Sequence, residues 1–360
     1  MQLRFMMEDS IMVKDKVCTA GSSILYNFKA PFSATAYEKC IAGGMDFTGL
    51  VVTDELGLDG LFDRSDETSS SIKCLLENKC DIVLCNDVFG KLRRQAPQNG
   101  LIYIQPAYGT VSRYGLVPAV SSMDQIGVLC KNINEGMYSL SVISGHDEKD
   151  GTSLPQANYS YGSENKKETP MKVGISNKIL KVNDSSEGVN VEFKYFDVMA
   201  QVSYILSSAE ICNNTNRYDG VKFGLRSEDT SGINDLYIKT RTAGFKKDLH
   251  LASIVGCMVL SQEYYDDLYD KSMRIRRLIK DYYTELFSEV DMIALPVKLN
   301  MKSVNGMDKY RQSALYALSL LGGFVAASLP VNGHGVQLVT LHGREATMFS
   351  FMAKAQEVFK

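Results

Sequence analysis

Residues 106–130 (PAYGTVSRYGLVPAVSSMDQIGVLC) constrain the fold of this chain more than any other stretch. They are rich in Gly, Ser and Pro, yet apolar residues recur among them at close intervals. Gly109 and Gly115 accept a positive φ without steric cost, and Pro118 has a fixed φ. A segment this long without regular structure is functional or disordered, and this one is too apolar for disorder. The pattern therefore predicts an ordered, irregular segment that is packed into a core.

Polar residues of this segment should then be satisfied locally. We expect Ser112, Ser121 and Ser122 to be shielded from solvent and to bond to backbone groups within the segment. Arg113 should be satisfied by a carboxylate or by carbonyl groups. Such bonds would keep the irregular backbone in one shape.

Two phrases of the segment, residues 108–117 (YGTVSRYGLV) and 121–127 (SSMDQIG), resemble the amidase signature family, most closely the A subunits of its Glu-tRNA(Gln) amidotransferases. The resemblance extends from about Ile11 to Lys360. It implies an α/β fold, a central mixed β-sheet covered by helices on both sides, in a single domain of residues 1–360. The helical region that the family places before its lysine strand has no counterpart here. In function, the resemblance implies glutamine chemistry in tRNA-dependent amidation.

Composition limits the class of protein and the ligands that it can bind. Apolar residues make up 45% of the 360 and charged residues 22%, as is typical of soluble globular proteins. The net charge of −3 provides no basic field, so direct binding of nucleic acid is not expected. Eight cysteines without close paired spacing indicate reduced, mostly buried thiols, and no apolar run is long enough to span a membrane. We expect a cytoplasmic protein, with an organellar matrix as the alternative.

Residues 10–15 (SIMVKD) predict a short strand that ends in a lysine. In the amidase signature family a strand of this kind ends in Lys-Asp, and that lysine is the base of a Ser-Ser-Lys triad. The resemblance therefore assigns Lys14 to the base. Without the resemblance, Lys14 is an exposed lysine at a strand end. A lysine base works only if burial lowers its pKa and a hydroxyl lies within hydrogen-bond reach.

The next elements follow from local signals. Residues 34–42 predict a helix with Ser33 as its N-cap and an end at Gly43-Gly44. A strand is expected at about residues 48–53, and the adjacent carboxylates of Asp54-Glu55 indicate a solvated turn.

Residues 86–91 (NDVFGK) occupy the place of the family's Ser-Asp-Thr-Gly-Gly-Ser motif, whose last serine is the nucleophile. Asp87 and Gly90 match the motif. Phe89 stands at a glycine position, where we expect its side chain to fill part of the family's cavity. Lys91 stands at the position of the nucleophile. The resemblance thus implies that this hydroxyl has been lost.

The relay serine of the triad belongs roughly two dozen positions upstream, and Glu67 stands there. The family's glycine-rich serine loop aligns with residues 65–71 (SDETSSS), which contain no glycine. The serines at 69–71 are expected to cap a helix over residues 71–79. Cys74, Cys80 and Cys85 lack metal-ligand spacing and have no nearby histidine, so neither a metal nor another cofactor is expected.

The second half of the chain resembles the amidotransferase protein in several phrases, and Tyr204 is retained as a candidate pocket tyrosine. The arginine with which that protein holds the glutamine carboxylate is absent, since Leu251 and Ala252 stand in its place. Neither can imitate a bidentate guanidinium. The acidic residue that holds the substrate amine falls near Gln312-Ser313, and neither residue is acidic. Basic residues on a predicted helix over residues 262–287 indicate a solvated face.

Two functions are compatible with this pattern. One is a catalytically inactive paralogue that acts as a binding or scaffolding protein, with a B- or C-subunit-like protein as partner. The alternative is an amidase, a glutaminase or an amidotransferase subunit with a rebuilt site that uses Lys14, Lys91, Asp87 or the serines at 69–71. Lys91 beside Lys14 would place two like charges together, which lowers a lysine pKa and creates a nucleophilic amine. A gene product without a selected role is the third interpretation.

Overall fold

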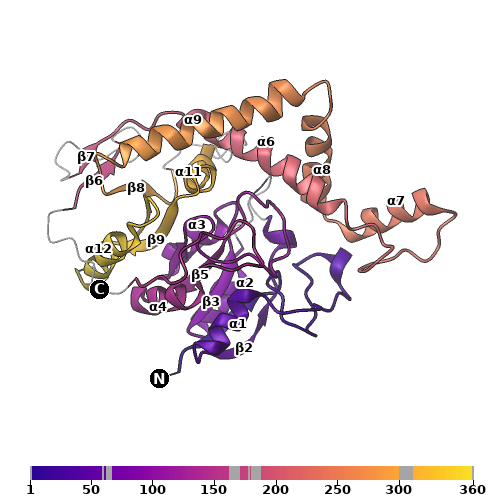
Figure 1. The fold of residues 1–360 in the computed structure, drawn as a ribbon, viewed down its shortest axis with the longest axis horizontal. Helices are drawn as coiled ribbons and strands as arrows, with labels where there is room; N and C mark the ends of the chain where they lie inside the picture. Colours follow the sequence, from indigo (N-terminus) through magenta and orange to yellow (C-terminus); the bar gives the residue numbers. More distant parts are fainter. Residues whose placement is uncertain are drawn as a thin grey trace.

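A computed structural model describes residues 2–58, 61, 67–161, 171–176, 179, 188–299 and 311–358 (Figure 1). Its strands form one mixed sheet in the order β2-β1-β3-β5-β4-β9-β10-β8-β6-β7, which confirms the expected α/β class. The strands are β1 (Arg4–Glu8), β2 (Asp46–Val51), β3 (Ile82–Asn86), β4 (Ile102–Gln105), β5 (Ile126–Cys130), β6 (Val173–Ile175), β7 (Val189–Asn190), β8 (Met292–Pro296), β9 (Val325–Val331) and β10 (His334–Thr340).

The helices lie between these strands in the first part of the chain, whereas α6 to α9 follow one another. They are α1 (Thr35–Ala42), α2 (Ser70–Leu76), α3 (Lys91–Gln98), α4 (Ile133–Ile143), α6 (Phe196–Thr215), α7 (Ile233–Gly244), α8 (Lys247–Val259), α9 (Lys271–Leu286), α11 (Ala314–Gly322) and α12 (Glu345–Val358). Short helical turns are η1 (Ser23–Leu25), η2 (Glu55–Gly57) and η4 (Tyr265–Asp270). Within the described residues no helix combines the length and apolar character needed to cross a membrane.

Strand pairing makes the sheet mixed. β1 is parallel to both β2 and β3, and β8 is parallel to β6. The centre, from β3 through β5, β4, β9 and β10 to β8, is antiparallel. Because β1 and β3 are parallel neighbours, the residues that follow their carboxyl ends meet at the same edge of the sheet.

Side chains alternate between the two faces of the central strands, as the period of a β-strand requires. On β3, Ile82 and Leu84 join one hydrophobic cluster, whereas Val83 and Cys85 join another. Helices α1, α4 and α12 cover the first face. Helices α2 and α3 cover the other, and α6, α9 and α11 extend that layer through the largest cluster. The sheet is therefore covered on both sides, as expected.

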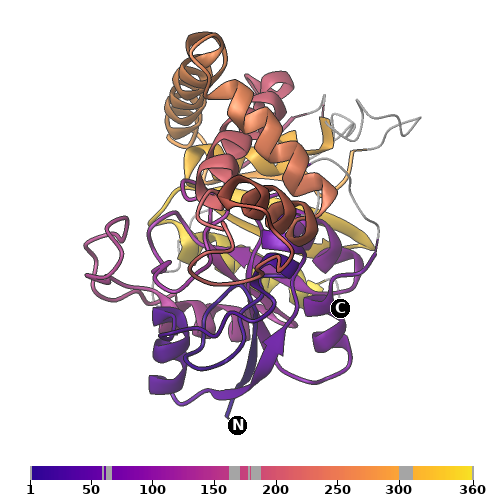
Figure 2. The same ribbon diagram turned by 90° about the vertical axis from the view of Figure 1, so that its right-hand side faces the viewer.

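Helices α6, α8 and α9 lie together along one side of the molecule, and α7 projects furthest from the sheet (Figure 1). In the view turned by 90° the same helices are stacked above the sheet (Figure 2). On α9, Ile279, Tyr283 and Leu286 are buried, which is the spacing of one helix face. Most of its basic residues are exposed, as the sequence predicted, but Arg276 is half-buried and donates to the carbonyl of Leu321 and to Ser122.

Several local predictions are confirmed, and two are wrong. Helix α1 ends at Gly43, and Gly44 has a φ of 75°. However, Ser33 does not cap α1, because its Oγ accepts the backbone N–H of Lys14 at 3.0 Å and Ala34 occupies the N-cap position. The strand expected at residues 10–14 lies earlier, at β1.

Candidate functional site

The candidate site lies where β1 and β3 end. Glu8 is the last residue of β1 and Asn86 the last of β3, and the backbone N–H of Asn86 donates to Glu8 Oε2 at 3.0 Å. Ser71, on the first turn of α2, donates from Oγ to Glu8 Oε1 at 3.0 Å. The two strand ends and one helix start therefore converge on a single carboxyl group.

Glu8 is deeply buried, with 3% of its surface exposed. Burial raises the pKa of Glu8 to about 8, although the hydrogen bonds from Asn86 and Ser71 act in the opposite direction. The carboxyl group is therefore largely neutral at pH 7. A neutral acid can donate one hydrogen bond, but it provides no negative charge to the site.

The loop of residues 86–91 keeps a defined backbone through Asp87 and Gly90. The carboxylate of Asp87 accepts the backbone N–H groups of Leu92 and Arg93 at 2.9 and 3.0 Å, which satisfies the open start of α3. Gly90 has a φ of 78°, and a Cβ there would lie 2.2 Å from the ring of Tyr316. Only glycine fits this position without strain.

A buried ion pair stabilises the loop of residues 86–91. The guanidinium of Arg93, with 0% exposure, donates from Nε to Asp87 at 3.0 Å and from Nη1 to Ser319 Oγ at 2.8 Å. It also donates to the carbonyl groups of Asp87 and Tyr316. Every arm of the guanidinium is therefore engaged.

Phe89 and Lys91 of the loop differ in environment. Phe89 is buried in the largest hydrophobic cluster and its ring stacks on Tyr204, with centroids 6.4 Å apart. Phe89 is therefore buried beside Tyr204, and its filling of the family's cavity stays a prediction. Lys91 opens α3, and its Nζ lies 2.8 Å from the carboxylate of Asp54, with 10% of the lysine side chain exposed. A paired ammonium group therefore occupies the start of this helix.

Lys14 is not part of this cluster. It follows β1 by six positions rather than ending it, and its side chain is exposed. Exposure removes the condition that a lysine base requires, which is burial away from water. The prediction that Lys14 ends a strand is therefore wrong, whereas its exposure agrees with the interpretation made without the resemblance. The idea of a nucleophilic Lys91 beside Lys14 loses its physical basis, because the charge of Lys91 faces a carboxylate.

Glu67 also lies outside the cluster. Its side chain is 79% exposed and lies 3.5 Å from Lys73, while its carbonyl accepts a hydrogen bond from Gln95. Ser69 caps α2 as expected, because its Oγ accepts the backbone N–H of Ser71. Of the three serines at 69–71, it is Ser71 that faces the candidate site.

Only one of the two carboxylates in the turn at Asp54-Glu55 is exposed to solvent. Asp54 is 44% exposed in its side chain, but Glu55 is buried at 6%. Glu55 accepts hydrogen bonds from Ser22 Oγ at 2.6 Å and from the backbone N–H of Lys246. The prediction of a solvated pair is wrong for Glu55, because tertiary contacts with the start of α8 bury it.

The residues expected around a substrate serve structural roles. The hydroxyl of Tyr204 lies 2.9 Å from Ser313 Oγ. Gln312 is buried and bridges the carbonyl of Val297 and the backbone N–H of Leu299. On α8, Leu251 is 39% exposed. Tyr204 thus remains beside the loop of residues 86–91 through its contact with Phe89.

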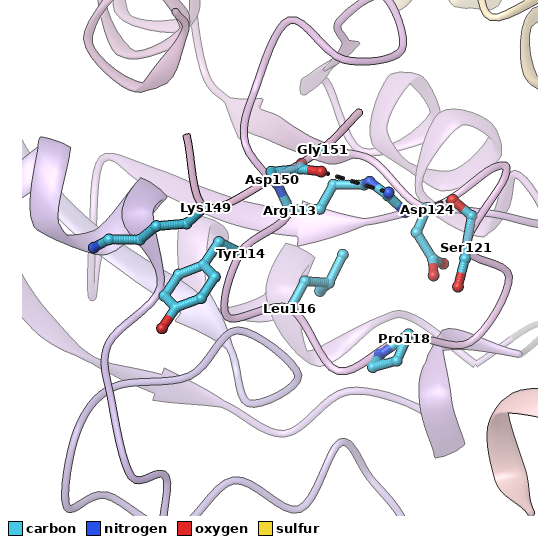
Figure 3. A pocket seen from close by; sticks show the side chains of 9 residues that line it. All are labelled: Arg113, Tyr114, Leu116, Pro118, Ser121, Asp124, Lys149, Asp150 and Gly151. Atoms are coloured by element: carbon cyan, nitrogen blue, oxygen red, sulfur yellow. Dashed lines mark hydrogen bonds and ion pairs between the residues drawn. The ribbon is translucent and has the colours of Figure 1, made fainter. Parts of the chain in front are cut away.

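A separate cavity of about 230 Å³ lies against the segment of residues 106–130 (Figure 3). Its lining residues come from that segment and from the following loop: Arg113, Tyr114, Leu116, Pro118, Ser121, Asp124, Lys149, Asp150 and Gly151. Asp124 connects this wall to the first cluster, because its Oδ1 accepts Asn86 Nδ2 at 3.0 Å. Burial raises the pKa of Asp124, against the hydrogen bonds that it accepts from Asn86, Val120 and Ala119.

The polar groups of the cavity wall are satisfied within the protein. Arg113 contacts Asp150, Thr152 Oγ1 and the carbonyl of Ser121, which confirms its predicted pairing. Ser112 accepts the backbone N–H of Tyr114 at 3.1 Å, as predicted. These bonds hold Arg113 against the loop that contains Asp150 and Thr152.

Ser121 and Ser122 depart from the prediction. Instead of bonding within the segment, Ser121 Oγ accepts from Asn214, and Ser122 donates to Glu210 at 2.5 Å. Both partners lie on α6. The two serines therefore join the segment to a helix that is distant in sequence.

Glu8 is the site residue that sequence reasoning missed, whereas Ser71 was among the candidate serines at 69–71. A usable signal was present, since Glu8-Asp9 is an acidic pair that ends an apolar stretch of residues 5–7 (FMM). Lys14-Asp15 is identical to the family's Lys-Asp pair, so the strand was expected to end at Lys14. The observed strand ends six residues earlier, at Glu8.

Comparisons with known proteins agree with the fold described above. The amidase family model matches residues 78–345. The chain is similar to the A subunit of the Glutamyl-tRNA(Gln) amidotransferase of Desulfosudis oleivorans, at 30% identity over 94% of this chain and 81% of that protein. It is similar to the corresponding protein of Sulfurimonas denitrificans, at 32% identity over 95% of this chain and 86% of that protein.

Solved structures show the same fold. The A subunit of the Glutamyl-tRNA(Gln) amidotransferase of Thermotoga maritima superposes with a TM-score of 0.70 at 23% identity, covering 99% of this chain and 82% of that one. The peptide amidase of Stenotrophomonas maltophilia superposes with a TM-score of 0.74 at 17% identity, covering 99% of this chain and 82% of that one. At such identities the likeness is one of fold.

Proposed function

Since this chain belongs to the amidase family, we propose that it is a catalytically inactive member that acts as a binding or scaffolding protein. Its partner would be a B- or C-subunit-like protein. The relatives are named as A subunits of an amidotransferase, which implies further subunits beside them. The proposal depends on what replaces the reactive groups and on which surface is free to bind.

The single observation that carries the proposal is the start of α3. The family's nucleophile is the last residue of the motif that residues 86–91 replace, and here that residue is Lys91, paired with Asp54. An ammonium group that is protonated in an ion pair has no lone pair with which to attack a carbonyl carbon. Phe89 meanwhile occupies the core beside Tyr204.

The base is replaced as well. We infer that Glu8-Asp9, at the end of β1, takes the place of the family's Lys-Asp pair, because Glu8 and not Lys14 ends that strand. A carboxyl group never carries the positive charge of a lysine, and one that is largely neutral accepts a proton only after it has ionised. Both ends of the proton relay are therefore altered.

A binding surface is present on α8. Leu251, Ile254 and Met258 are exposed by 39%, 67% and 45%, and their spacing places them on one face of the helix. On α7, Ile238 is exposed by 65%. Clustered apolar side chains of this size mark protein interaction sites. They support a protein partner rather than nucleic acid.

One observation favours the alternative of a rebuilt enzyme. Ser71 Oγ donates to Glu8, and a carboxyl group with a pKa of about 8 matches the strength of a general base near neutral pH. Burial weighs against this interpretation, because Ser71 is 1% exposed and Glu8 3% exposed. A nucleophile must reach its substrate.

Activity and labelling separate the two functions. The purified protein should release no ammonia from glutamine, asparagine or simple amides, and a fluorophosphonate probe should leave it unmodified. Stoichiometric labelling that disappears in Ser71→Ala, or turnover that disappears in Glu8→Gln, would establish the rebuilt enzyme instead.

Binding is tested with purified B and C subunits of an amidotransferase from the same cell. We expect a complex whose affinity falls at least tenfold in Ile254→Glu, because the charge would be buried at the contact. Val52→Glu is the matched control, since Val52 is 65% exposed beyond the edge strand β2. Failure of both subunits to bind, or equal loss in both variants, would count against the scaffold.

A further inference from the structure

Helices α6 and α8 approach each other unusually closely at Gly256. A Cβ at this position would lie 2.2 Å from the carbonyl oxygen of Ser208 and 2.5 Å from Cβ of Cys212. Glycine is the residue that allows two helix backbones to come so near. The close approach also determines what the next residue of α8 touches.

That residue is Cys257, and its Sγ lies 3.3 Å from Sγ of Cys212 on α6. Both thiols are free in the structure. Cys257 is exposed, whereas Cys212 is buried with 6% exposure. An accessible thiol therefore lies in contact with an inaccessible one, 45 positions away in the sequence.

We propose that Cys212 and Cys257 form a reversible disulfide when the chain meets a small-molecule disulfide such as oxidised glutathione. A disulfide bond is about 2.05 Å long, so the two sulfur atoms must approach by about 1.3 Å. The proposal therefore requires a side-chain rotation that brings the two sulfur atoms together. The inference does not depend on the proposed scaffold function.

The exchange has two steps. The thiolate of Cys257 attacks one sulfur of oxidised glutathione, forms a mixed disulfide and releases one reduced glutathione. Cys212 then loses its proton to solvent and attacks the sulfur of Cys257, which releases the second glutathione. Two protein thiols are oxidised, and one glutathione disulfide is reduced to two thiols.

The surroundings of the two cysteines favour attack by Cys257 first and by Cys212 second. Burial, followed by the neighbouring Cys257 thiol, raises the pKa of the Cys212 thiol, so Cys212 is the poorer first nucleophile. The guanidinium of Arg241 acts in the opposite direction and assists the second step. Arg241 is held in place by the carbonyl of Thr215, at the end of α6.

The bond would join α6 to α8 and close the loop that contains α7. The unfolded chain would lose entropy through this closure, so the oxidised protein should melt several degrees higher than the reduced one. It would also hold the exposed face of α8 in a fixed position on α6.

The test treats the full chain with oxidised glutathione and measures the intact mass. We expect a loss of two hydrogen atoms, a peptide that joins Cys212 to Cys257, and recovery of both thiols with dithiothreitol. Cys257→Ser should abolish the mass loss and the gain in melting temperature.

Cys74→Ser is the matched control, because Cys74 is a partly exposed thiol on α2. It should leave the mass loss unchanged. A stable glutathione adduct on Cys257, a bridge from Cys257 to another cysteine, or a lower melting temperature after oxidation would overturn the proposal.

Discussion

The segment of residues 106–130 and the loop of residues 86–91 are neighbours in space, yet their polar groups have different kinds of partner. In the longer segment, glycines fix the backbone shape and polar side chains join it to distant helices. Gly115 has a φ of 87°, and its carbonyl accepts the backbone N–H of Met12 at 2.8 Å. Ser122 reaches Glu210 and Arg276 on helices distant in sequence.

In the loop of residues 86–91, the polar contacts are local. Asp87 closes the start of α3, and Gly90 provides the left-handed turn. Phe89 lies in the core, and Lys91 is paired to Asp54. Under the proposed function, this loop keeps its shape without a reactive group, because stability depends on packing and backbone shape, which do not require a reactive hydroxyl.

The largest effect is expected from Gly115→Val. A Cβ there would lie 2.4 Å from Cα of Ala34, so strain at a positive φ and a backbone clash add to roughly 5 kcal/mol or more. We expect the variant to unfold or aggregate, as measured by thermal melting.

Gly100→Val is the control for this variant. Gly100 has a φ of 71° but no atom within 4 Å of its Cβ position, so it incurs only the backbone strain of about 1–3 kcal/mol. Equal losses in the two variants would show that packing around Gly115 is unimportant.

Arg93→Ala should have the next largest effect, because it removes a fully buried guanidinium and leaves Asp87 without its ion pair. Breaking a buried pair costs about 3–5 kcal/mol, measurable by chemical denaturation. Arg277→Ala, which breaks an exposed pair with Asp281, should change stability little. A small loss in Arg93→Ala would mean that the supporting frame of the loop is dispensable.

Glu8 predicts an unusual pH dependence. The folded pKa of about 8 lies above the usual value of 4.5, so the folded state binds more protons than the unfolded state between these values. Stability is therefore fully present below pH 4.5 and is lost as pH rises through 8, by roughly 3 kcal/mol between pH 5 and pH 8.

Glu8→Gln tests this, because the amide resembles the neutral acid and cannot ionise. The free energy of unfolding of the variant should fall less than that of the wild type over this pH range. Parallel pH profiles for the two proteins would show that Glu8 is charged in the fold.

Lys14→Ala should have the smallest effect, within about 0.5 kcal/mol, because the side chain is exposed. Lys91→Ala is the matched comparison, since Lys91 has 10% exposure and an ion pair with Asp54. If melting shows a greater loss for Lys14 than for Lys91, the assignment of Glu8 to the end of the strand is wrong.

The sequence by itself determined the family, the fold class and many of the elements. The expected helix at residues 34–42 is α1 within one residue, and the expected strand at about residues 48–53 is β2 within two residues. The assignment of Phe89 and Lys91 to motif positions stays a prediction, which depends on the matches at Asp87 and Gly90. These features depend on residues that are close in sequence, so local patterns predict them.

Only the tertiary structure decided which residues meet at the candidate site. The register of β1 is set by its parallel partners, with Met7 opposite both Leu50 and Leu84, and this pairing brings Glu8 to the end of the strand. The burial of Glu55 and the contact between Cys212 and Cys257 likewise depend on distant segments. Local sequence patterns do not predict such pairings, because the residues that pair lie far apart in the chain.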